Sequence, residues 1–432
     1  MGPDSASVLT EALAAAVAAA LAAHTVGRRT RGPTTPTAAA AAVAAAALVV
    51  AALRLRRSSG AHSARRSMPA FAQYPRQYVV HRGRPPAIDG DVHKAAWQRV
   101  PWSEPFLEIR GPRDAPEGSG PGEAQATRMK MLWDDEFLYI AAIMDVVAGD
   151  ELVARFTERN SPIFHTDSDF EVFVDPAGCC HGYKELELNA LNTVWNLMLN
   201  KPYADGGGER SGRVAREGDA DYWEVRRQRT AARVTRGVLH DASAPAQWCT
   251  EIALAHADTL PGAPVRGPTP SVGASWRINF SRVEKGGEVN WVWSPQVVWT
   301  PGAGRHTGQV NMHLPDAWGY AVFADADGKL ADGSPAEAWR DPAWPARQAA
   351  VAVYYAARAF REANGRGPHS LAELRKLSLL DEAALEAVDE VSLLPAGEAA
   401  SAEDFAAEAV GGGWAAHITQ DRLLRVRPVV PS

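Results

Sequence analysis

Strict alternation of apolar and polar residues is the feature that most constrains how this chain can fold. In DFEVFVDP (169–176), Phe170, Val172 and Val174 alternate with Glu171, Phe173 and Asp175. Successive side chains of a strand point to opposite sides of a sheet, so such a segment has one apolar and one mixed face. Segments 185–189, 193–199 and 276–281 repeat the pattern. The alternation predicts half-buried strands of an antiparallel sheet.

The residues between these strands favour short connections. Asp134 and Asp135 lie between two apolar arms, 128–133 and 137–144, where Asx side chains favour a hairpin turn. Gly- and Pro-rich stretches at 111–122, 205–218 and 261–273 predict long surface loops. No long amphipathic helix is expected before residue 340. We therefore predict an all-β fold over residues 85–323, an antiparallel β-sandwich of jelly-roll or immunoglobulin-like type.

The first 70 residues have the composition of a targeting segment. They are rich in Ala and carry eight Arg against only Asp4 and Glu11. The uncharged run 38–53, followed by Arg-Leu-Arg-Arg, resembles a signal-anchor, which would place the protein in the secretory pathway, membrane-anchored or extracellular. An organelle transit peptide, for chloroplast or mitochondrion, is the alternative, and an unprocessed low-complexity helix is a third.

The C-terminal region, residues 340–432, predicts a small helical appendage. Ala349, Val353, Ala356 and Phe360 recur at helical spacing in 345–364, and Gly365 follows as a stop signal. A second helix is expected after 370, where Ser and the Glu three residues later form a capping box. Residues 414–430 alternate loosely, as in a hairpin.

Composition excludes several classes of function. The net charge of −6 gives no broad positive field, so we expect no nucleic-acid partner. Three cysteines, Cys179, Cys180 and Cys249, are too few to staple a domain of this size and lack metal-site spacing. The sequence contains no phosphate-binding, dinucleotide or Gly-x-Ser-x-Gly motif. We expect a monomer.

Six segments in order give the central region a resemblance. They are Ile88-Asp-Gly90 with Trp97, LWDDEFLYIAA (132–142), DFEVFVDP (169–176), ELELNALNTVW (185–195), WRINFSR (276–282) and HLPDAWGYAVF (313–323). Together they resemble family 9 carbohydrate-binding modules, most closely the stand-alone bacterial type. The resemblance implies an antiparallel sandwich, structural calcium and a groove for the end of a sugar chain. Trp97, Trp133 and Trp318 lie in these fold-defining segments, and we expect them in the core.

The resemblance also implies a set of binding residues, which this chain keeps in part. Phe164 stands at the position of a stacking Trp, Glu171 retains a carboxylate, and Glu187 stands where the family has an arginine. No Trp stands near Asn311 for the second wall of the clamp, so Trp195 or Trp299 would have to replace it. The predicted carbohydrate-binding residues are Phe164, Glu171, Glu187, Asn189, Trp195, Trp299 and Asn311. For calcium, the expected oxygen ligands are Asp167, Asp169 and Asp175.

These residues predict non-catalytic binding of a carbohydrate, either a glycan chain end or a small saccharide. A structural or protein-interaction sandwich that has lost sugar binding is the first alternative, because Glu187 and the missing Trp alter the clamp. A glycoside hydrolase is the second, with Glu171 and Glu187 as the two carboxylates that such a reaction needs. After the sandwich is subtracted, however, too little chain remains for a separate catalytic domain.

Overall fold

The computed structural model describes residues 73–394 and 405–430, which belong to one compact unit beginning at Pro69. The expected targeting segment, residues 1–70, lies outside the described residues. In the described part of the chain, no helix has both the length and the apolar character needed to cross a membrane.

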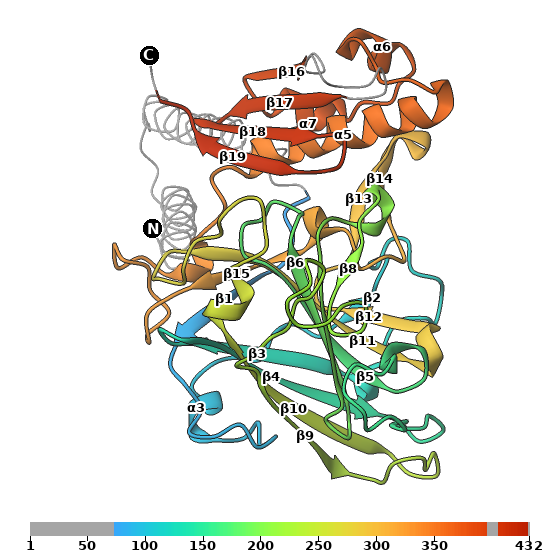
Figure 1. Cartoon of the computed structure of the whole chain (residues 1–432), viewed down its shortest axis with the longest axis vertical. Helices are drawn as coiled ribbons and strands as arrows, with labels where there is room; N and C mark the ends of the chain where they lie inside the picture. The colour runs from blue at the N-terminus through green and yellow to red at the C-terminus, as the bar shows by residue number, and fades with distance from the viewer. Residues whose placement is uncertain (1–72, 395–404, 431–432) are drawn as a thin grey trace, which may run out of the picture. The chain divides into compact units, whose positions relative to one another are not determined.

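One curled sheet of thirteen strands makes up most of the molecule (Figure 1). In spatial order its strands are β8 (Glu209–Arg210), β7 (Val194–Leu199), β6 (Tyr183–Asn189), β5 (Asp169–Asp175), β11 (Ser275–Glu284), β15 (Gly319–Phe323), β1 (Gln77–Arg82), β3 (Thr127–Trp133), β4 (Phe137–Val146), β10 (Ala246–Ala255) and β9 (Arg229–Arg236). Two short strands, β12 (Val289–Val292) and β2 (Leu107–Glu108), extend it beside β11.

Strand β1 joins the two halves of this sheet. Its first four residues pair with β15 and its last two with β3, and both pairings are parallel. The predicted all-β sandwich is confirmed, but the expectation that every pairing is antiparallel is wrong at β1. A strand shared between two halves lets the sheet fold back on itself, so that both inner faces enclose one core.

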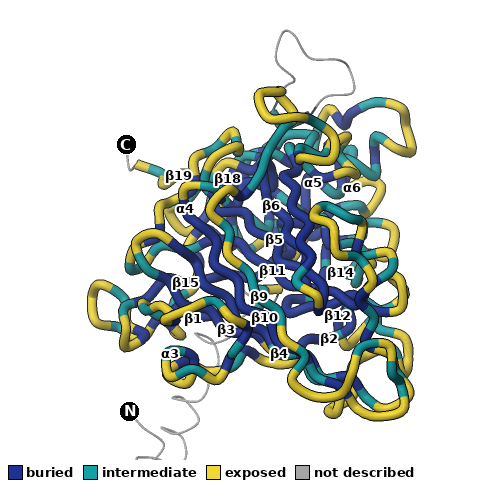
Figure 2. Tube along the Cα trace, turned by 60° about the horizontal axis from the view of Figure 1, so that its bottom comes forward, coloured by how far each residue is buried: buried dark blue, intermediate teal, exposed yellow. Residues whose placement is uncertain are grey.

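The core follows the predicted alternation. Phe170, Val172 and Val174 of β5 pack inward with residues of β3, β4, β10 and β11. However, β5, β6 and β7 are buried along their whole lengths, and so are residues 276–281 of β11. The expectation of half-buried strands is therefore wrong for all four segments (Figure 2). Their outer face is covered by short helical turns and loops, which strand periodicity does not reveal. The three Trp expected in the core, Trp97, Trp133 and Trp318, are at most 1% exposed.

Short helical turns connect the strands. They are η2 (Glu123–Gln125), η3 (Ile163–His165), η4 (Tyr203–Asp205), η5 (Lys285–Gly287), η6 (Pro301–Ala303), η7 (Pro315–Ala317), η8 (Ala336–Ala338), α3 (Ala95–Gln98) and α4 (His256–Thr259). A separate hairpin, β13 (Val297–Thr300) with β14 (Arg305–Gly308), lies next to the C-terminal region.

The C-terminal region contains helices and a sheet. Helix α5 (Trp344–Asn364) packs on a four-stranded antiparallel sheet and ends at Gly365 with φ 67°, as predicted. Ser370 caps α6 (Leu371–Lys376) by accepting from the Glu373 amide, also as predicted. Helix α7 (Glu382–Glu386) and strands β16 (Glu390–Leu394), β17 (Ala406–Gly411), β18 (Trp414–Thr419) and β19 (Leu424–Pro428) complete the region. Only the β18–β19 hairpin of this sheet was expected.

Candidate functional site

A groove of about 670 Å³ lies over the outer face of β5, β6 and β7. Its floor comes from these strands, and its walls come from η3, η4, η5 and two loops around residues 213 and 311. Its volume lies in the range of about 300–1,000 Å³ that is usual for small-molecule sites. Polar residues that line it include Glu171, Glu185, Glu187, Arg213, Asn311 and His313, and aromatic ones include Phe164, Phe173, Trp195 and Tyr203.

Strand register explains why these side chains meet. Glu171 of β5 lies directly opposite Glu187 of β6, and Glu187 lies opposite Trp195 of β7. Glu185 is two residues before Glu187 and therefore shares its face. Directly opposed residues on neighbouring strands have Cβ atoms only about 5 Å apart, so the register alone forces the carboxylates together.

The aromatic side chains do not form an open clamp. The rings of Phe164 and Trp195 pack directly on one another, with centroids 4.8 Å apart and an interplanar angle of 35°. The guanidinium of Arg213 lies 4.1 Å from the Trp195 ring centroid, and Trp195 is only 4% exposed. A pyranose ring therefore cannot enter between Phe164 and Trp195. The accessible aromatic surface is the half-buried Phe164 and the Tyr203 ring, which is 46% exposed.

The carboxylates on the floor are buried and resist ionisation. Burial raises the pKa of Glu171 to about 7. Burial also raises the pKa of Glu185 and of Glu187 well above the usual value, and the charge of Glu171 adds to both shifts. Their protons, or a bound cation, must compensate for this concentration of negative charge.

Five of the seven predicted carbohydrate-binding residues line this groove: Phe164, Glu171, Glu187, Trp195 and Asn311. Asn189 does not, because its side chain holds a turn. Its amide nitrogen donates to the Phe156 carbonyl and to Asp167, and its oxygen accepts from the amides of Leu191 and Thr193.

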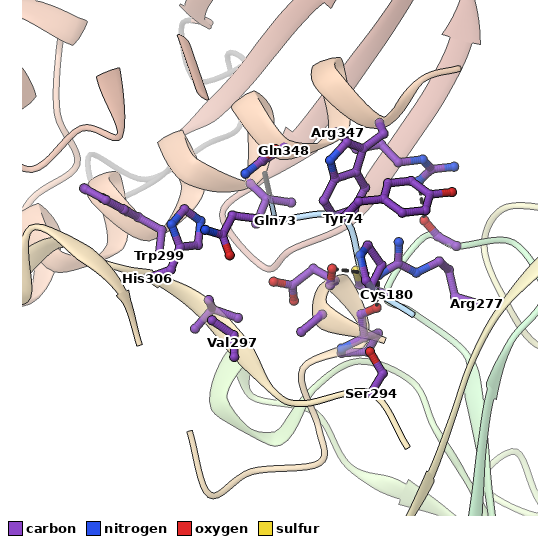
Figure 3. Close-up of a pocket in the computed structure, with 18 of the residues that line it drawn as sticks. Gln73, Tyr74, Cys180, Arg277, Ser294, Val297, Trp299, His306, Arg347 and Gln348 are labelled. Carbon is purple, nitrogen blue, oxygen red and sulfur yellow. Dashed lines mark hydrogen bonds between the residues drawn. The ribbon is translucent and has the colours of Figure 1, made fainter. Parts of the chain in front are cut away.

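Trp299 is also placed away from the groove. It lies beside His306 at one end of a separate cavity of about 240 Å³ between the β13–β14 hairpin and α5 (Figure 3). Its indole nitrogen donates to the Leu379 carbonyl at 2.8 Å. This cavity is smaller than a usual ligand site, and Trp299 serves to join the C-terminal region to the sandwich.

The three expected calcium ligands do not converge. Asp167 accepts hydrogen bonds from the amides of Arg155 and Phe156, and Asp175 accepts from the Cys180 amide at the far end of β5. Asp169 instead lies with Glu171 and Glu187, and one carboxylate oxygen from each lies within 4.8 Å of the others. The structure therefore does not bring the three predicted ligands together, and of these three Asp169 alone belongs to a group that could hold an ion.

Sequence reasoning missed four groove residues, Glu185, Tyr203, Arg213 and His313. Glu185 could have been found, because it alternates with Leu186 in phase with Glu187. Tyr203 and Arg213 lie in an irregular loop region, where no periodicity indicates direction. His313 is held through its ring Nδ1, 3.0 Å from the Tyr183 hydroxyl, and burial lowers its pKa to about 4.

Comparison with known proteins gives matches in structure alone. No protein-family model and no curated protein matches the chain. A family 9 carbohydrate-binding module from Caldicellulosiruptor kristjanssonii in complex with glucose is 15% identical, over 58% of this chain and 96% of the module, with a TM-score of 0.33. The cellotriose complex of a family 9 module from the same organism is 16% identical, over 62% of this chain and 98% of that one, with a TM-score of 0.33.

A proposed carbohydrate-binding protein from Bacteroides uniformis is 12% identical, over 58% of this chain and 99% of that protein, with a TM-score of 0.37. The chain is similar in fold to these structures. Because each TM-score is below 0.5, the function of the groove must follow from its own side chains.

Proposed function

We propose that this chain binds a carbohydrate in the groove over β5, β6 and β7 without cutting it. The observation that carries the proposal is the pairing of a carboxylate floor with the exposed Tyr203 ring in one open groove. Sugar hydroxyls donate to carboxylates, and the C–H groups of a pyranose pack on an aromatic face. A chain end or a small saccharide fits a groove of this size, and the role would be attachment to a glycan or capture of a sugar during carbohydrate breakdown.

The polar groups of the groove are mostly acceptors. Glu171, Glu185 and Glu187 offer carboxyl oxygens, while Asn311 uses its own oxygen to accept from the His313 amide and has its amide nitrogen for donation. Arg213 already pairs with Glu209 at 2.8 Å. We therefore expect the ligand to present several hydroxyl donors, as a neutral saccharide does, and not a carboxylate or phosphate.

A hydrolytic role is less well supported by the same carboxylates. A glycosidase needs one carboxyl group that is protonated and one that is ionised, which requires environments that push the two pKa values apart. Here burial raises the pKa of both Glu171 and Glu187. They also lie side by side on the floor and do not face each other across the groove.

A sandwich that has lost sugar binding is the competing function. The observation that favours it is the direct packing of Phe164 on Trp195, which closes the space of a two-ring clamp. If the groove does bind sugar, binding must depend on Tyr203 in place of that clamp. Substitution of Tyr203 therefore distinguishes the two functions.

The test is a titration of the full chain with saccharides, beginning with glucose and cellotriose and continuing on a broad glycan array. For a sugar that binds, Tyr203→Ala should weaken the affinity about tenfold, which corresponds to one aromatic contact of about 1.4 kcal/mol. Leu377→Ala is the matched control, because Leu377 is similarly exposed, at 51%, but lies beyond α6 in the C-terminal region. Absence of binding to every glycan would favour the interaction sandwich, whereas equal affinity in Tyr203→Ala would mean that the sugar binds without Tyr203 and would overturn this site.

A further inference from the structure

Two carboxylates of the groove floor, Glu171 and Glu187, lie together with a third, Asp169, that does not line the groove. Glu171 and Glu187 are cross-strand partners, and Asp169 lies two residues before Glu171 on the same face of β5. One oxygen from each lies within 4.8 Å of the other two. In residues 73–394 and 405–430 they are the one group of three or more possible metal ligands that lie this close together.

Asp169 is buried although no hydrogen bond compensates for the burial of its carboxylate. It is 0% exposed, and neither of its carboxylate oxygens accepts a hydrogen bond from any group in the described part of the chain. The Val283 amide lowers the pKa of Asp169, but this effect is smaller than the rise caused by burial and by the charges of Glu171 and Glu284. Glu187, at 2% exposure, also has one oxygen without a partner. A buried polar atom without a partner needs an explanation, and a bound ion is one of those that apply to a carboxylate oxygen.

Neighbouring charges do not neutralise this group. The charged side chains that act most strongly on Asp169 are Glu171 and Glu284, and those that act on Glu187 are Glu171, Asp169 and Glu185. Arg213, whose charge acts on the neighbouring Glu185, already pairs with Glu209 at 2.8 Å, and Glu284 already pairs with Arg282 at 2.7 Å. Buried charges are ordinarily paired or bound to a metal, so the floor lacks a positive partner among the described residues.

We propose that Asp169, Glu171 and Glu187 together bind one divalent cation of the calcium class at the floor of the groove. Oxygens around calcium lie about 2.3–2.6 Å from the ion, so two oxygens on opposite sides are separated by about 5 Å. None of the separations here exceeds 4.8 Å, which is compatible with such a shell. Magnesium demands about 2.0–2.1 Å and a near-ideal octahedron, to which three carboxylates fixed on the two strands β5 and β6 are less suited than to the flexible shell of calcium.

The proposed site is open on one side. Asp169 lies beneath the floor, whereas Glu171 and Glu187 line the groove itself. Calcium takes six to eight oxygens, more than three carboxylates supply without help. Water fills the remaining positions in the free protein, and hydroxyl oxygens of a groove ligand can replace it. This ion would therefore lie at the ligand site, in contrast to the structural calcium expected at Asp167, Asp169 and Asp175.

Calcium binding to the chelator-stripped full chain, in the absence of any sugar, tests the site directly. Calorimetry should give one ion per chain with a dissociation constant below about 1 mM, and magnesium should bind more weakly. Asp169→Asn and Glu187→Gln should each weaken calcium at least about tenfold. Glu288→Gln is the matched control, since Glu288 is an exposed carboxylate at the rim of the same groove.

Folding of the variants is checked by their thermal unfolding in chelator. Both amide substitutions remove a buried charge without changing the shape of the side chain. In chelator, the melting temperatures of the two variants should therefore equal or exceed that of the unchanged protein. Excess calcium should raise the melting temperature of the unchanged protein only. Lack of calcium binding by the unchanged protein, or equal binding by both amide variants, would overturn the proposal. Because no sugar is present, neither result decides whether the groove binds carbohydrate.

Discussion

Glu187 takes part in both the acidic floor and the aromatic wall of the groove. It faces Glu171 on one side and Trp195 on the other. An arginine here, as the family resemblance implies, would pair with Glu171 and donate to sugar hydroxyls. A glutamate instead adds a second buried acceptor, so the floor must take up protons or a cation. One side chain thus changes the charge of the whole site.

His313 makes the groove sensitive to acid. Burial lowers its pKa to about 4 from an ordinary 6.5, so the unfolded chain binds a proton that the folded chain does not between these values. Stability contributed by the neutral ring is therefore complete above about pH 6.5 and is lost as the pH falls to about 4, by up to about 3 kcal/mol. His313→Gln should not show this loss.

The measurement is the free energy of unfolding by urea at several pH values between 7 and 4. The difference between the unchanged protein and His313→Gln should shrink steadily as the pH falls. His93→Gln, on an exposed side chain, serves as control. A difference that stays constant across this range would show that the pKa of His313 is the same in the folded and unfolded chains, so that burial does not lower it.

At the scale of elements, periodicity and turn chemistry predicted the strands well. Phe170, Val172 and Val174 face the core because alternation and register agree, and Asp134 holds its hairpin by accepting from the amides of Glu136 and Phe137. Periodicity placed groove residues only on strands, as for Glu171 and Glu187, while Phe164 in η3 and Asn311 in a loop were predicted from the family resemblance. Tyr203 lies in η4 beyond β7, and its direction is set by tertiary contacts that no local pattern contains.

One buried carboxylate of β10 holds residues 89–97, at the start of the sandwich, in place. Glu251, 0% exposed, accepts from the Trp97 indole at 2.6 Å, from the amides of Asp89 and Gly90 at 2.9 Å, and from Lys94 at 2.7 Å. Glu251→Ala would leave the Trp97 indole and the two amides without this acceptor and would leave Lys94 with only Asp89 and the Ala87 carbonyl. We expect it to lower the free energy of unfolding by about 3–5 kcal/mol, as when one member of a buried ion pair is removed.

Chemical denaturation of Glu251→Ala measures this cost. The exposed Glu136, which pairs with Arg227 on the surface, is the control, and its change to Ala should alter stability by less than about 1 kcal/mol. Equal effects of the two substitutions would mean that water can replace Glu251. The segment from Ile88 to Trp97 would then be held by other contacts.

At the scale of the whole described unit, the C-terminal region supports one wall of the groove. Arg422, 1% exposed, pairs with Asp205 at 3.0 Å and with Asp316 at 2.9 Å. Asp205 is the last residue of η4, the turn that presents Tyr203 to the groove. Tyr354 of α5 also donates to Asp205, so two elements of the C-terminal region hold this turn.

This connection predicts that Arg422→Met will weaken the groove from a distance. Removing the guanidinium leaves two buried carboxylates with fewer partners, and we expect a loss of about 3 kcal/mol or more in the free energy of unfolding. Because η4 is then less firmly held, affinity for a saccharide that stacks on Tyr203 should fall several-fold, although Arg422 does not line the groove. Arg427→Met, which breaks an exposed pair with Glu408, should change neither quantity. If Arg422→Met lowers stability but leaves saccharide affinity intact, the C-terminal region stabilises the sandwich without positioning Tyr203.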